Sequence, residues 1–365
     1  MKSLAIDVRM WNSSGIGTYI KNIVPLLVDK FDVFLLGNNN EIKNYGFYDK
    51  VKVVECNSSI YSIKEQFELF NKIPKCDIFW SPHYNVPLLP IKGGKRVVTI
   101  HDVYHLAFYN LLSLKQKLYA NTMINHAMKN SDIIFTVSEF SKQEIIRYTK
   151  ADYKKIFVTY NTIDNRRFKI IDSNNFLESI RKKHGLPEKF ILFVGNPKPH
   201  KNIKNLLLAL KHIDNLNLVI VGKKEGFITG DNEIKYLIQN SSFLQNRVYF
   251  TGYVADEEIP VIYNLASLFV FPSLYEGFGF PPLEAMATGT PVVASNAASI
   301  PEVCGDAALY FNPLNIEDIA AKILKIVHND DMKKTLINKG FNQVKKYSWG
   351  KSASKFQDII NRELK

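Results

Sequence analysis

Short apolar runs rich in Val, Ile, Leu and Phe recur along this chain of 365 residues, and stretches with helical periodicity separate them. Each run is nearly continuous rather than alternating, which is typical of strands buried on both faces of a parallel sheet. Strands that alternate with helices predict βαβ units, and therefore doubly wound α/β sheets. The clearest strand candidates are residues 4–10, 31–37, 76–82, 96–102, 131–138 and 155–161, followed by 190–196, 216–223, 247–254, 266–273 and 291–296.

The series of runs restarts at about residue 190, after a long polar segment. A chain of this length commonly forms two domains. We therefore predict an N-terminal domain over residues 1–165 and a second domain over residues 166–346. Residues 347–365 have an amphipathic helical pattern with no strand after it.

Composition restricts the location and the partners. The N-terminus lacks a secretory signal pattern, no apolar run is long enough to span a bilayer, and the three cysteines are far apart and in no metal-ligand spacing. We expect a cytoplasmic protein, without a metal site, that attaches at most peripherally to the inner face of the cytoplasmic membrane. The net charge of +12 is spread evenly along the chain, which disfavours a nucleic-acid footprint and suits an anionic membrane surface or phosphorylated ligands.

Open α/β sheets bind ligands beyond the carboxyl ends of their strands, so the residues that follow each strand are candidates. Gly15 and Gly17 follow the first strand and open a helix, where a phosphate or sugar could approach the backbone. A tight strand-to-helix turn explains them equally well. Tyr19 and Ile20 stand where a dinucleotide fingerprint would have its third glycine, which disfavours a nicotinamide or flavin enzyme.

Two later strand ends carry candidate polar groups. His101 ends the strand over residues 96–102, although a lone histidine is more often structural. Gly195 begins a basic turn that contains Lys201 and leads into a leucine-rich helix, and this arrangement can hold a diphosphate. A solvated basic turn is the alternative.

The most specific signal is a glycine-rich loop after the strand over residues 266–273. Glu276 lies in this loop, and Gly277, Phe278 and Gly279 offer backbone amides to phosphate or sugar oxygens. Glu284 follows eight residues after Glu276, and we expect it on the first turn of the next helix, where it could accept hydrogen bonds from a ribose diol. One glutamate alone would be ordinary helix capping, but the whole string is hard to explain in that way.

This loop resembles the donor-binding block of the retaining glycosyltransferases of family 4. Further matching segments spread the resemblance over nearly the whole chain; they are SGIG (14–17), VSEFSKQEI (137–145), VTYNTID (158–164), FVGNPKPHKN (193–202) and PEVCGDAALYFNP (301–313). The resemblance implies the GT-B fold, with two Rossmann-like doubly wound parallel-sheet domains, an interdomain cleft, and a C-terminal helix that crosses back to the N-terminal domain. It also implies an enzyme that moves a hexose from a nucleotide-diphosphate sugar to a glycan or lipid-linked glycan in surface polysaccharide synthesis, with no metal or other cofactor.

The resemblance also implies a role for each candidate residue. His101 and Glu276 would be the catalytic residues; His101 would contact the transferred sugar and Glu276 would bind its hydroxyl groups. Lys201 would neutralise the departing diphosphate, and Glu284 would hold the ribose. The glycines and the loop amides would line the donor, with Gly15 and Gly17 in the N-terminal domain and Gly195, Gly277, Phe278 and Gly279 in the second.

His200 stands where the family commonly has an arginine, and could add a pH-dependent charge. The segments IDVRM (6–10) and SPHYNVPLLP (81–90) are similar to those of bacterial O-antigen mannosyltransferases, which favours GDP-mannose as the donor. A UDP-hexose, a UDP-N-acetylhexosamine and dTDP-rhamnose stay open as donors. Three other functions also stay open: a sugar-nucleotide epimerase of the same fold, a nicotinamide-dependent dehydrogenase, and a basic scaffold without catalysis.

Overall fold

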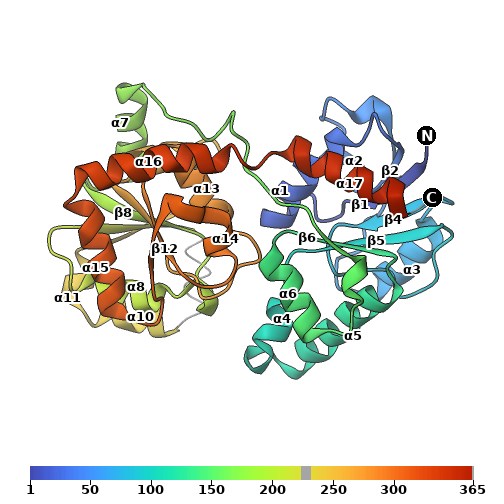
Figure 1. Cartoon of the computed structure of the whole chain (residues 1–365), viewed down its shortest axis with the longest axis horizontal. Coiled ribbons are helices and arrows are strands. Elements are labelled where there is room, and N and C mark those ends of the chain that lie inside the picture. Colours follow the sequence, from blue (N-terminus) through green and yellow to red (C-terminus); the bar gives the residue numbers. More distant parts are fainter. Residues whose placement is uncertain (223–231, 364–365) are drawn as a thin grey trace. The chain divides into compact units, whose positions relative to one another are not determined.

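The computed structural model describes residues 1–222 and 232–363, and the chain forms two compact units. The first unit comprises residues 1–161 together with 348–365, and the second comprises residues 162–347 (Figure 1). Each unit is built around one parallel sheet with helices on its faces, which confirms the predicted doubly wound α/β class. Among the described residues, no helix is long and apolar enough to cross a membrane.

The first unit has seven strands in the order β3-β2-β1-β4-β5-β6-β7. These are β1 (Ser3–Asp7), β2 (Asp32–Gly37), β3 (Val51–Glu55), β4 (Ile78–Ser81), β5 (Lys95–Ile100), β6 (Ile133–Thr136) and β7 (Ile156–Val158). Its helices are α1 (Ser14–Ile23), η1 (Val24–Leu26), α2 (Asn39–Ile42), η2 (Tyr48–Lys50), α3 (Ile63–Lys72), α4 (Tyr104–Ala107), η3 (Tyr109–Leu111), α5 (Leu114–Asn130), α6 (Glu139–Tyr148), η4 (Tyr153–Lys155) and α17 (Trp349–Glu363).

Helix α17 joins the first unit through an aromatic contact. The Phe356 ring is fully buried and lies 4.7 Å from the Trp80 ring and 4.6 Å from the Phe135 ring, measured between centroids. Burial of such a ring typically stabilises a fold by about 1.5–3 kcal/mol. The amphipathic pattern at the C-terminus therefore reflects packing against the strands of this unit (Figure 1).

The second unit has six strands in the order β10-β9-β8-β11-β12-β13. These are β8 (Phe190–Val194), β9 (Asn217–Val221), β10 (Val248–Gly252), β11 (Leu268–Phe271), β12 (Val292–Ser295) and β13 (Ala308–Phe311). The described helices are α7 (Asn174–Lys183), η5 (Pro199–Lys201), α8 (Ile203–Leu210), α10 (Asn232–Gln239), α11 (Ser242–Gln245), α12 (Ile259–Leu265), α13 (Phe280–Ala287), α14 (Ile300–Cys304), η6 (Gly305–Ala307), α15 (Ile316–Val327) and α16 (Asp330–Val344).

Two strands, β3 and β13, were not among the predicted candidates, and both lie at an edge of their sheet. In β3, the exposed Lys52 and Glu55 interrupt the valines, because an edge strand is covered less completely than a central one. A search for continuous apolar runs therefore misses β3, although it finds the edge strands β7 and β10.

Candidate active site

Lys201 is held at the carboxyl end of β8 by a well-fixed turn. Gly195 has a φ of +148°, a conformation that favours glycine, and Asn202 has a φ of +55° directly before α8. The Asn202 side-chain amide donates hydrogen bonds to the carbonyl oxygens of Pro272 (3.1 Å) and Pro313 (2.7 Å). This amide therefore ties the turn that carries Lys201 to the segments that follow β11 and β13.

Glu276 lies in the loop between β11 and α13, and Ser299 fixes this loop. The Ser299 hydroxyl lies 2.9 Å from the carbonyl oxygen of Glu276 and 2.7 Å from that of Phe278, and donates to these acceptors. Gly279 has a φ of +117° immediately before the helix, where a residue with a side chain would be strained. The Ser299 hydrogen bonds and the Gly279 conformation thus fix the loop, which ends at a helix N-terminus, where backbone amides favour anions.

Lys201 and Glu276 form an ion pair, with 2.6 Å between the Lys201 Nζ and the Glu276 Oε1. Both side chains are mostly buried, with 18% and 14% of their surfaces exposed. Strands β8 and β11 are neighbours at the point where the strand order reverses, because β9 and β10 lie on one side of β8 and β11 on the other. Ligands of doubly wound sheets bind at this switch point, and the pair therefore marks the expected crevice.

Glu284 lies in the second turn of α13, so the expectation of a first-turn position was wrong. The helix begins at Phe280, directly after the loop, and its first turn has no acidic residue. The Tyr263 hydroxyl donates a 2.9 Å hydrogen bond to the Glu284 Oε2. Burial raises the pKa of Glu284 to about 7, against the lowering effects of this hydrogen bond and of the Arg167 charge. Glu284 is therefore close to half-protonated at neutral pH.

His200 does not supply a second cation at neutral pH in this structure. Burial, reinforced by the adjacent Lys201 charge, lowers the pKa of His200 to about 4. The side chain that stands in the place of the family's arginine is thus a neutral imidazole, and the pH-dependent charge considered from the sequence would appear only in acid.

In the first unit, Gly17 has a structural reason to be glycine. It is buried in α1, and a Cβ at this position would collide with the carbonyl oxygen of Trp11. Gly15, two residues earlier, is exposed to solvent. The tight-turn interpretation therefore accounts for Gly17 without any ligand.

His101 directly follows β5 and is neutral. Its Nε2 lies 2.9 Å from the carbonyl oxygen of Pro82, which can only accept, so this nitrogen carries the proton. Burial and the nearby His83 lower the pKa of His101 to about 4, although the Pro82 hydrogen bond opposes this shift. The Tyr19 ring packs edge-on at 5.0 Å and fixes the orientation of the imidazole.

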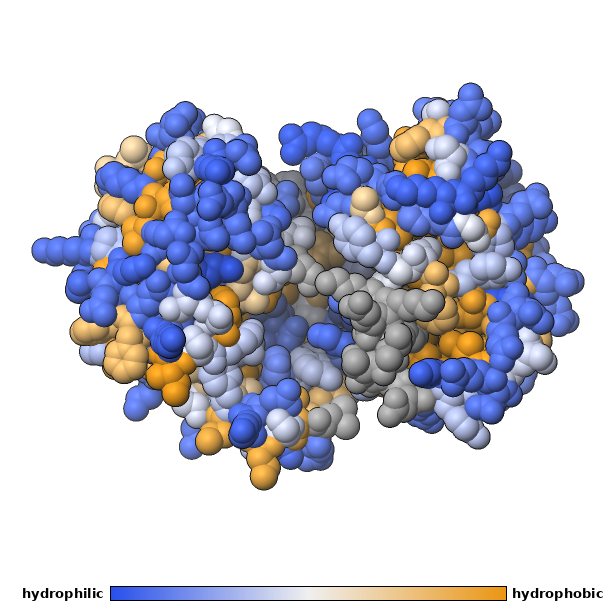
Figure 2. All heavy atoms as spheres, turned by 180° about the vertical axis from the view of Figure 1, so that it is seen from behind, coloured by the Kyte–Doolittle hydropathy of each residue, from blue (hydrophilic) through white to orange (hydrophobic). Residues whose placement is uncertain are grey.

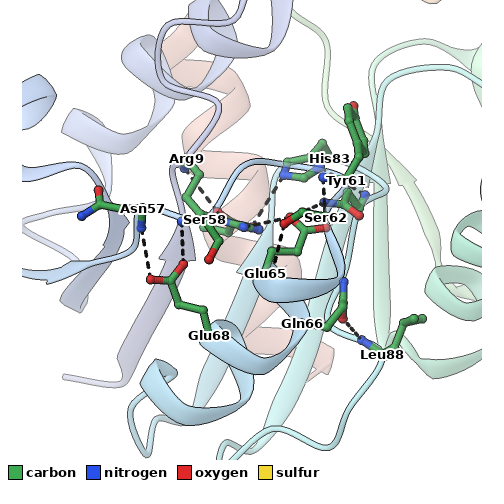
Figure 3. Close-up of polar contacts among 12 residues, drawn as sticks. Arg9, Asn57, Ser58, Tyr61, Ser62, Glu65, Gln66, Glu68, His83 and Leu88 are labelled. Carbon is green, nitrogen blue, oxygen red and sulfur yellow. Dashed lines mark hydrogen bonds and ion pairs between the residues drawn. The ribbon is translucent and has the colours of Figure 1, made fainter.

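A buried polar network lies at the switch point of the first sheet, between the ends of β1 and β4. The Arg9 guanidinium donates to both oxygens of Asp7 (2.9 and 2.7 Å) and to Glu65 (2.9 Å). The Asn85 side-chain amide donates to both Glu65 oxygens at 2.9 and 3.0 Å, and His83 Nε2 lies 3.7 Å from Asp7. Figure 3 shows the Arg9 and Glu65 side chains directed toward each other.

The network contains charges that are unusually well buried. The side chains of Arg9, Asp7 and Glu65 expose 3%, 0% and 1% of their surface. Burial alone would raise the pKa of Asp7, but the Arg9 charge and hydrogen bonds hold it well below its usual range. Removing one member of such a set costs about 3–5 kcal/mol, whereas an apolar core of the same volume is often equally stable. The network is therefore better explained by the conformation it specifies than by stability.

Residues 13–167 match the protein family described as Glycosyltransferase Family 4, and residues 177–343 match the family described as Glycosyl transferases group 1. The chain is a family 4 glycosyltransferase. This confirms the predicted family and enzyme class over the dehydrogenase and scaffold alternatives.

Relatives of this glycosyltransferase include two proteins of Escherichia coli. O-antigen chain mannosyltransferase B is 29% identical over 285 residues, which are 74% of this chain and 71% of that protein. Serotype-specific mannosyltransferase WbdA is 31% identical over 255 residues, which are 68% of this chain and only 31% of that longer protein. This glycosyltransferase is thus related to mannosyltransferases of O-antigen synthesis, and its match spans less than a third of WbdA.

A solved structure shows the same fold. Sucrose-phosphate synthase from Thermosynechococcus elongatus superposes with a TM-score of 0.77 and 18% identity, over 99% of each chain. The predicted GT-B class of two doubly wound domains is confirmed by this likeness and by the two parallel sheets.

Seven of the predicted site residues of the glycosyltransferase lie in the segments that follow β8 and β11, beyond the carboxyl ends of these two central strands of the second unit. These are Gly195, Lys201, Glu276, Gly277, Phe278, Gly279 and Glu284. The other three predicted residues follow β1 and β5 in the first unit, and are Gly15, Gly17 and His101. The roles of all ten in binding and catalysis stay predictions.

Several supporting residues of the enzyme were missed by the sequence interpretation. Tyr263 and Ser299 hold Glu284 and the Glu276 loop from 21 and 23 residues away, and no local signal identifies them. The buried network was partly visible, because the segments over residues 6–10 and 81–90 contain most of its members. Those segments were recognised by resemblance, but their shared position was not.

Proposed function

We propose that this enzyme transfers mannose from GDP-mannose to a glycan or lipid-linked glycan acceptor in surface polysaccharide synthesis, with retention of the anomeric configuration. The observation that carries the proposal is the Lys201–Glu276 ion pair at the switch point of the second sheet. The relatives named as O-antigen mannosyltransferases support the sugar and the pathway class.

The pair gives each member a task once the donor enters. The donor diphosphate would attract the Lys201 ammonium from Glu276, and the Glu276 carboxylate would then accept hydrogen bonds from sugar hydroxyls. The Lys201 charge would stabilise the leaving GDP, since a preorganised cation acts most strongly where charge develops. The fixed loop at the start of α13 would add its amides to the same group, and Glu284 would hold the ribose.

Retention needs either a same-face transfer or a covalent intermediate. In the same-face route, the acceptor oxygen bonds to the anomeric carbon as the bond to the diphosphate breaks, and the acceptor proton passes to a diphosphate oxygen. Because Glu276 would be engaged with the sugar hydroxyls and Glu284 with the ribose, we favour this route. A neutral His101 beside the sugar would not repel the positive charge that develops on its ring.

A donor screen tests the proposal. We expect product release from GDP-mannose in the presence of a mannose-containing acceptor, with UDP-hexoses, UDP-N-acetylhexosamines and dTDP-rhamnose turned over at least about a hundredfold more slowly, the range of a site that rejects a mismatched polar ligand. The anomeric configuration of the product would be read by NMR. Turnover of another donor would move the assignment to that sugar, and donor consumption without an acceptor would indicate an epimerase.

We expect transfer to continue in excess EDTA, because Lys201 would neutralise the leaving diphosphate in place of a metal ion. The measurement compares initial rates with and without chelator, and then after addition of Mn²⁺ or Mg²⁺. Loss of activity in EDTA that either metal restores would contradict the assignment to Lys201.

We further propose that α5 attaches the enzyme to an anionic membrane surface. At its N-terminal end, Leu114 and Leu118 are 84% and 70% exposed, next to Lys115 and Lys117. Figure 2 shows hydrophobic side chains standing out among hydrophilic ones on the face that it displays. The other half of the helix packs into the core through Ala120, Met123, Ile124, Ala127 and Met128. Surface attachment and core packing thus involve different halves of the same helix.

A second segment rich in basic residues, KGGKRVVTI (92–100), is engaged in the fold instead. Lys95 pairs with Asp132 at 3.0 Å, and Arg96 donates to the carbonyl oxygens of Pro87 and Leu89. We therefore assign attachment to α5 alone.

Vesicle sedimentation tests this assignment. We expect salt-sensitive binding to phosphatidylglycerol vesicles over phosphatidylcholine vesicles, with about 1 kcal/mol from each well-placed lysine. Changing Leu114 and Leu118 together to serine should reduce binding about a hundredfold or more, since each leucine that inserts into the membrane contributes about 1.5–3 kcal/mol. Leu314→Ser is the control, because Leu314 is similarly exposed (72%) in the other unit. Equal binding to both vesicle types would remove the electrostatic contribution.

A further inference from the structure

We propose that an aromatic strip on the first unit binds a pyranose ring of the acceptor glycan, and that the buried network exists to hold this strip in place. The strip consists of Tyr119, Tyr61, Tyr84, His105 and Tyr104. This inference rests on the proposed function, since it names the surface that recognises the acceptor.

The five rings form a continuous series. Between centroids, Tyr119 lies 5.5 Å from Tyr61, and Tyr61 lies 6.4 Å from the nearly parallel ring of Tyr84. The His105 ring is 5.5 Å from that of Tyr84 and 5.8 Å from that of Tyr104. Tyr61 is 49% exposed, and the other four are partly exposed. The series thus offers ring faces and edges to solvent over several residues from distant parts of the sequence.

The strip lies where a ligand of this sheet is expected. Tyr84 follows β4, and β4 borders the point where the strand order of the first sheet reverses. Tyr104 and His105 follow β5, on the same segment as His101, and the Tyr104 amide donates a 2.9 Å hydrogen bond to the Asp102 Oδ1. The strip therefore begins three residues from the histidine to which we assign contact with the transferred sugar.

Tyr61 is held in a strained backbone conformation. Its φ of +70° is rare for a residue with a bulky side chain, and such strain persists only where the surroundings impose it. The Tyr61 backbone amide donates a 3.1 Å hydrogen bond to the Glu65 Oε1 (Figure 3). The Asn85 side chain donates to the same oxygen, and Arg9 donates to the Oε2 of this carboxylate. The hydrogen bonds of the buried network thus extend to the backbone of Tyr61, the most exposed residue of the strip.

The same network reaches two further rings. The Tyr119 hydroxyl donates to the Asn85 Oδ1, and the backbone N–H of Asn85 donates to the His83 Nδ1 at 3.1 Å. Tyr84 lies between His83 and Asn85 in the sequence, so both of its neighbours are anchored. Burying the three charges of the network costs desolvation free energy, and the network fixes the positions of three rings. A ligand that binds to those rings would explain why such a network is present.

The chemistry of the strip fits a sugar. Ring faces contact the C–H face of a pyranose, while phenol and imidazole groups at the rim bind its hydroxyls. Burial raises the pKa of Tyr61 and of Tyr84, so their phenols stay protonated and can donate at any pH that the enzyme meets. All five members carry a polar group, whereas a surface for a hydrocarbon chain would not require one.

The test uses Tyr61→Asn in the full chain. Asparagine adopts the left-handed conformation more readily than tyrosine, so the melting temperature should stay equal or rise. Loss of the ring should raise the acceptor KM about tenfold or more and weaken binding of mannotriose in calorimetric titration by the same factor, while the donor KM stays within about twofold. Tyr61→Phe, which keeps the ring, should stay close to the parent protein, as should Tyr153→Asn, which removes an exposed tyrosine (61%) of the same unit outside the strip.

Unchanged mannotriose binding and unchanged acceptor KM in Tyr61→Asn would overturn the proposal. Reduced attachment to vesicles with unchanged sugar binding would also overturn it, and would assign the strip to the membrane. The titration needs no donor, so its result is separate from that of the proposed function, which fails if the parent protein transfers no sugar from any donor in the screen.

Discussion

Lys201→Ala should lower kcat/KM for the donor by about two to three orders of magnitude, the usual cost of removing one preorganised charge from a transition state. The variant loses the cation that would face the leaving diphosphate, and it leaves the Glu276 carboxylate, 14% exposed, without its partner at 2.6 Å. Two negative groups would then share the crevice. Steady-state kinetics with varied donor measures the effect, and circular dichroism verifies the fold.

The matched control is Lys198→Ala. Lys198 lies three residues earlier in the same turn and is exposed, so the net charge changes equally while the site keeps its ammonium. We expect activity within about twofold of the parent, as for most exposed substitutions. Equal losses in both variants would indicate general attraction of an anionic donor rather than a contact with Lys201.

A double variant separates the two parts of the loss. In Lys201→Ala/Glu276→Gln, the repulsion between Glu276 and the diphosphate is absent, so donor affinity should recover in part relative to Lys201→Ala. Such non-additivity is expected of residues in direct contact. Strict additivity of the two changes would show that the ion pair has no role in donor binding.

The sequence predicts the fold well because the central strands are buried on both faces. The run from Phe190 to Val194 is apolar at every position, and it forms β8 as expected. In β3, by contrast, the exposed Lys52 and Glu55 interrupt the apolar run, so the strand is not recognised from the sequence. Charged residues are tolerated there because a strand at the edge of a sheet is less completely buried than a central one.

The sequence predicts candidate site residues, but not the residues that support them in the structure. Glu276 and Glu284 stand in a loop-and-helix string whose composition is informative by itself. Tyr263 donates a hydrogen bond to Glu284 from a different helix. The backbone amide of Tyr61 is bonded to Glu65, and Glu65 is fixed by Arg9 and Asn85, which are 56 and 20 residues away from it in the sequence. Such contacts join residues that are far apart in the sequence, so no local sequence pattern reveals them.

The two glutamates should separate in kinetics. Glu284→Gln should mainly raise the donor KM, because a ribose contact is the same in the ground and transition states. Glu276→Gln should mainly lower kcat, because Glu276 would contact the sugar on which charge develops. The Lys201 ammonium, released from its partner, should hold the diphosphate at least as tightly in that variant. If both changes merely shifted stability by about 1 kcal/mol with no kinetic pattern, the two residues would be structural.

The donor KM should also depend on pH through Glu284. Its pKa of about 7 means that the carboxyl is mostly protonated at pH 6 and mostly ionised at pH 8. Only the ionised form can accept hydrogen bonds from both ribose hydroxyls, so the donor KM should fall by up to about tenfold between these values. Glu284→Gln should remove this dependence. The pKa values of His101 and His200, about 4, place their titration outside the window.

The melting temperature, measured as a function of pH, reports the ionisation of the Glu284 carboxyl independently of the kinetics. A carboxyl whose folded pKa lies above its unfolded value stabilises the fold in acid, and this contribution is lost as the pH rises from about 4.5 through about 7. Glu284→Gln removes the cost of the buried charge, so its melting temperature relative to the parent should be higher at pH 8 than at pH 6. A sugar-nucleotide donor suits the kinetic test, because its diphosphate does not titrate in this range. If the donor KM is independent of pH while the difference between the melting temperatures changes with pH as expected, Glu284 is a buried acid that does not touch the ribose, and other residues must hold the nucleotide.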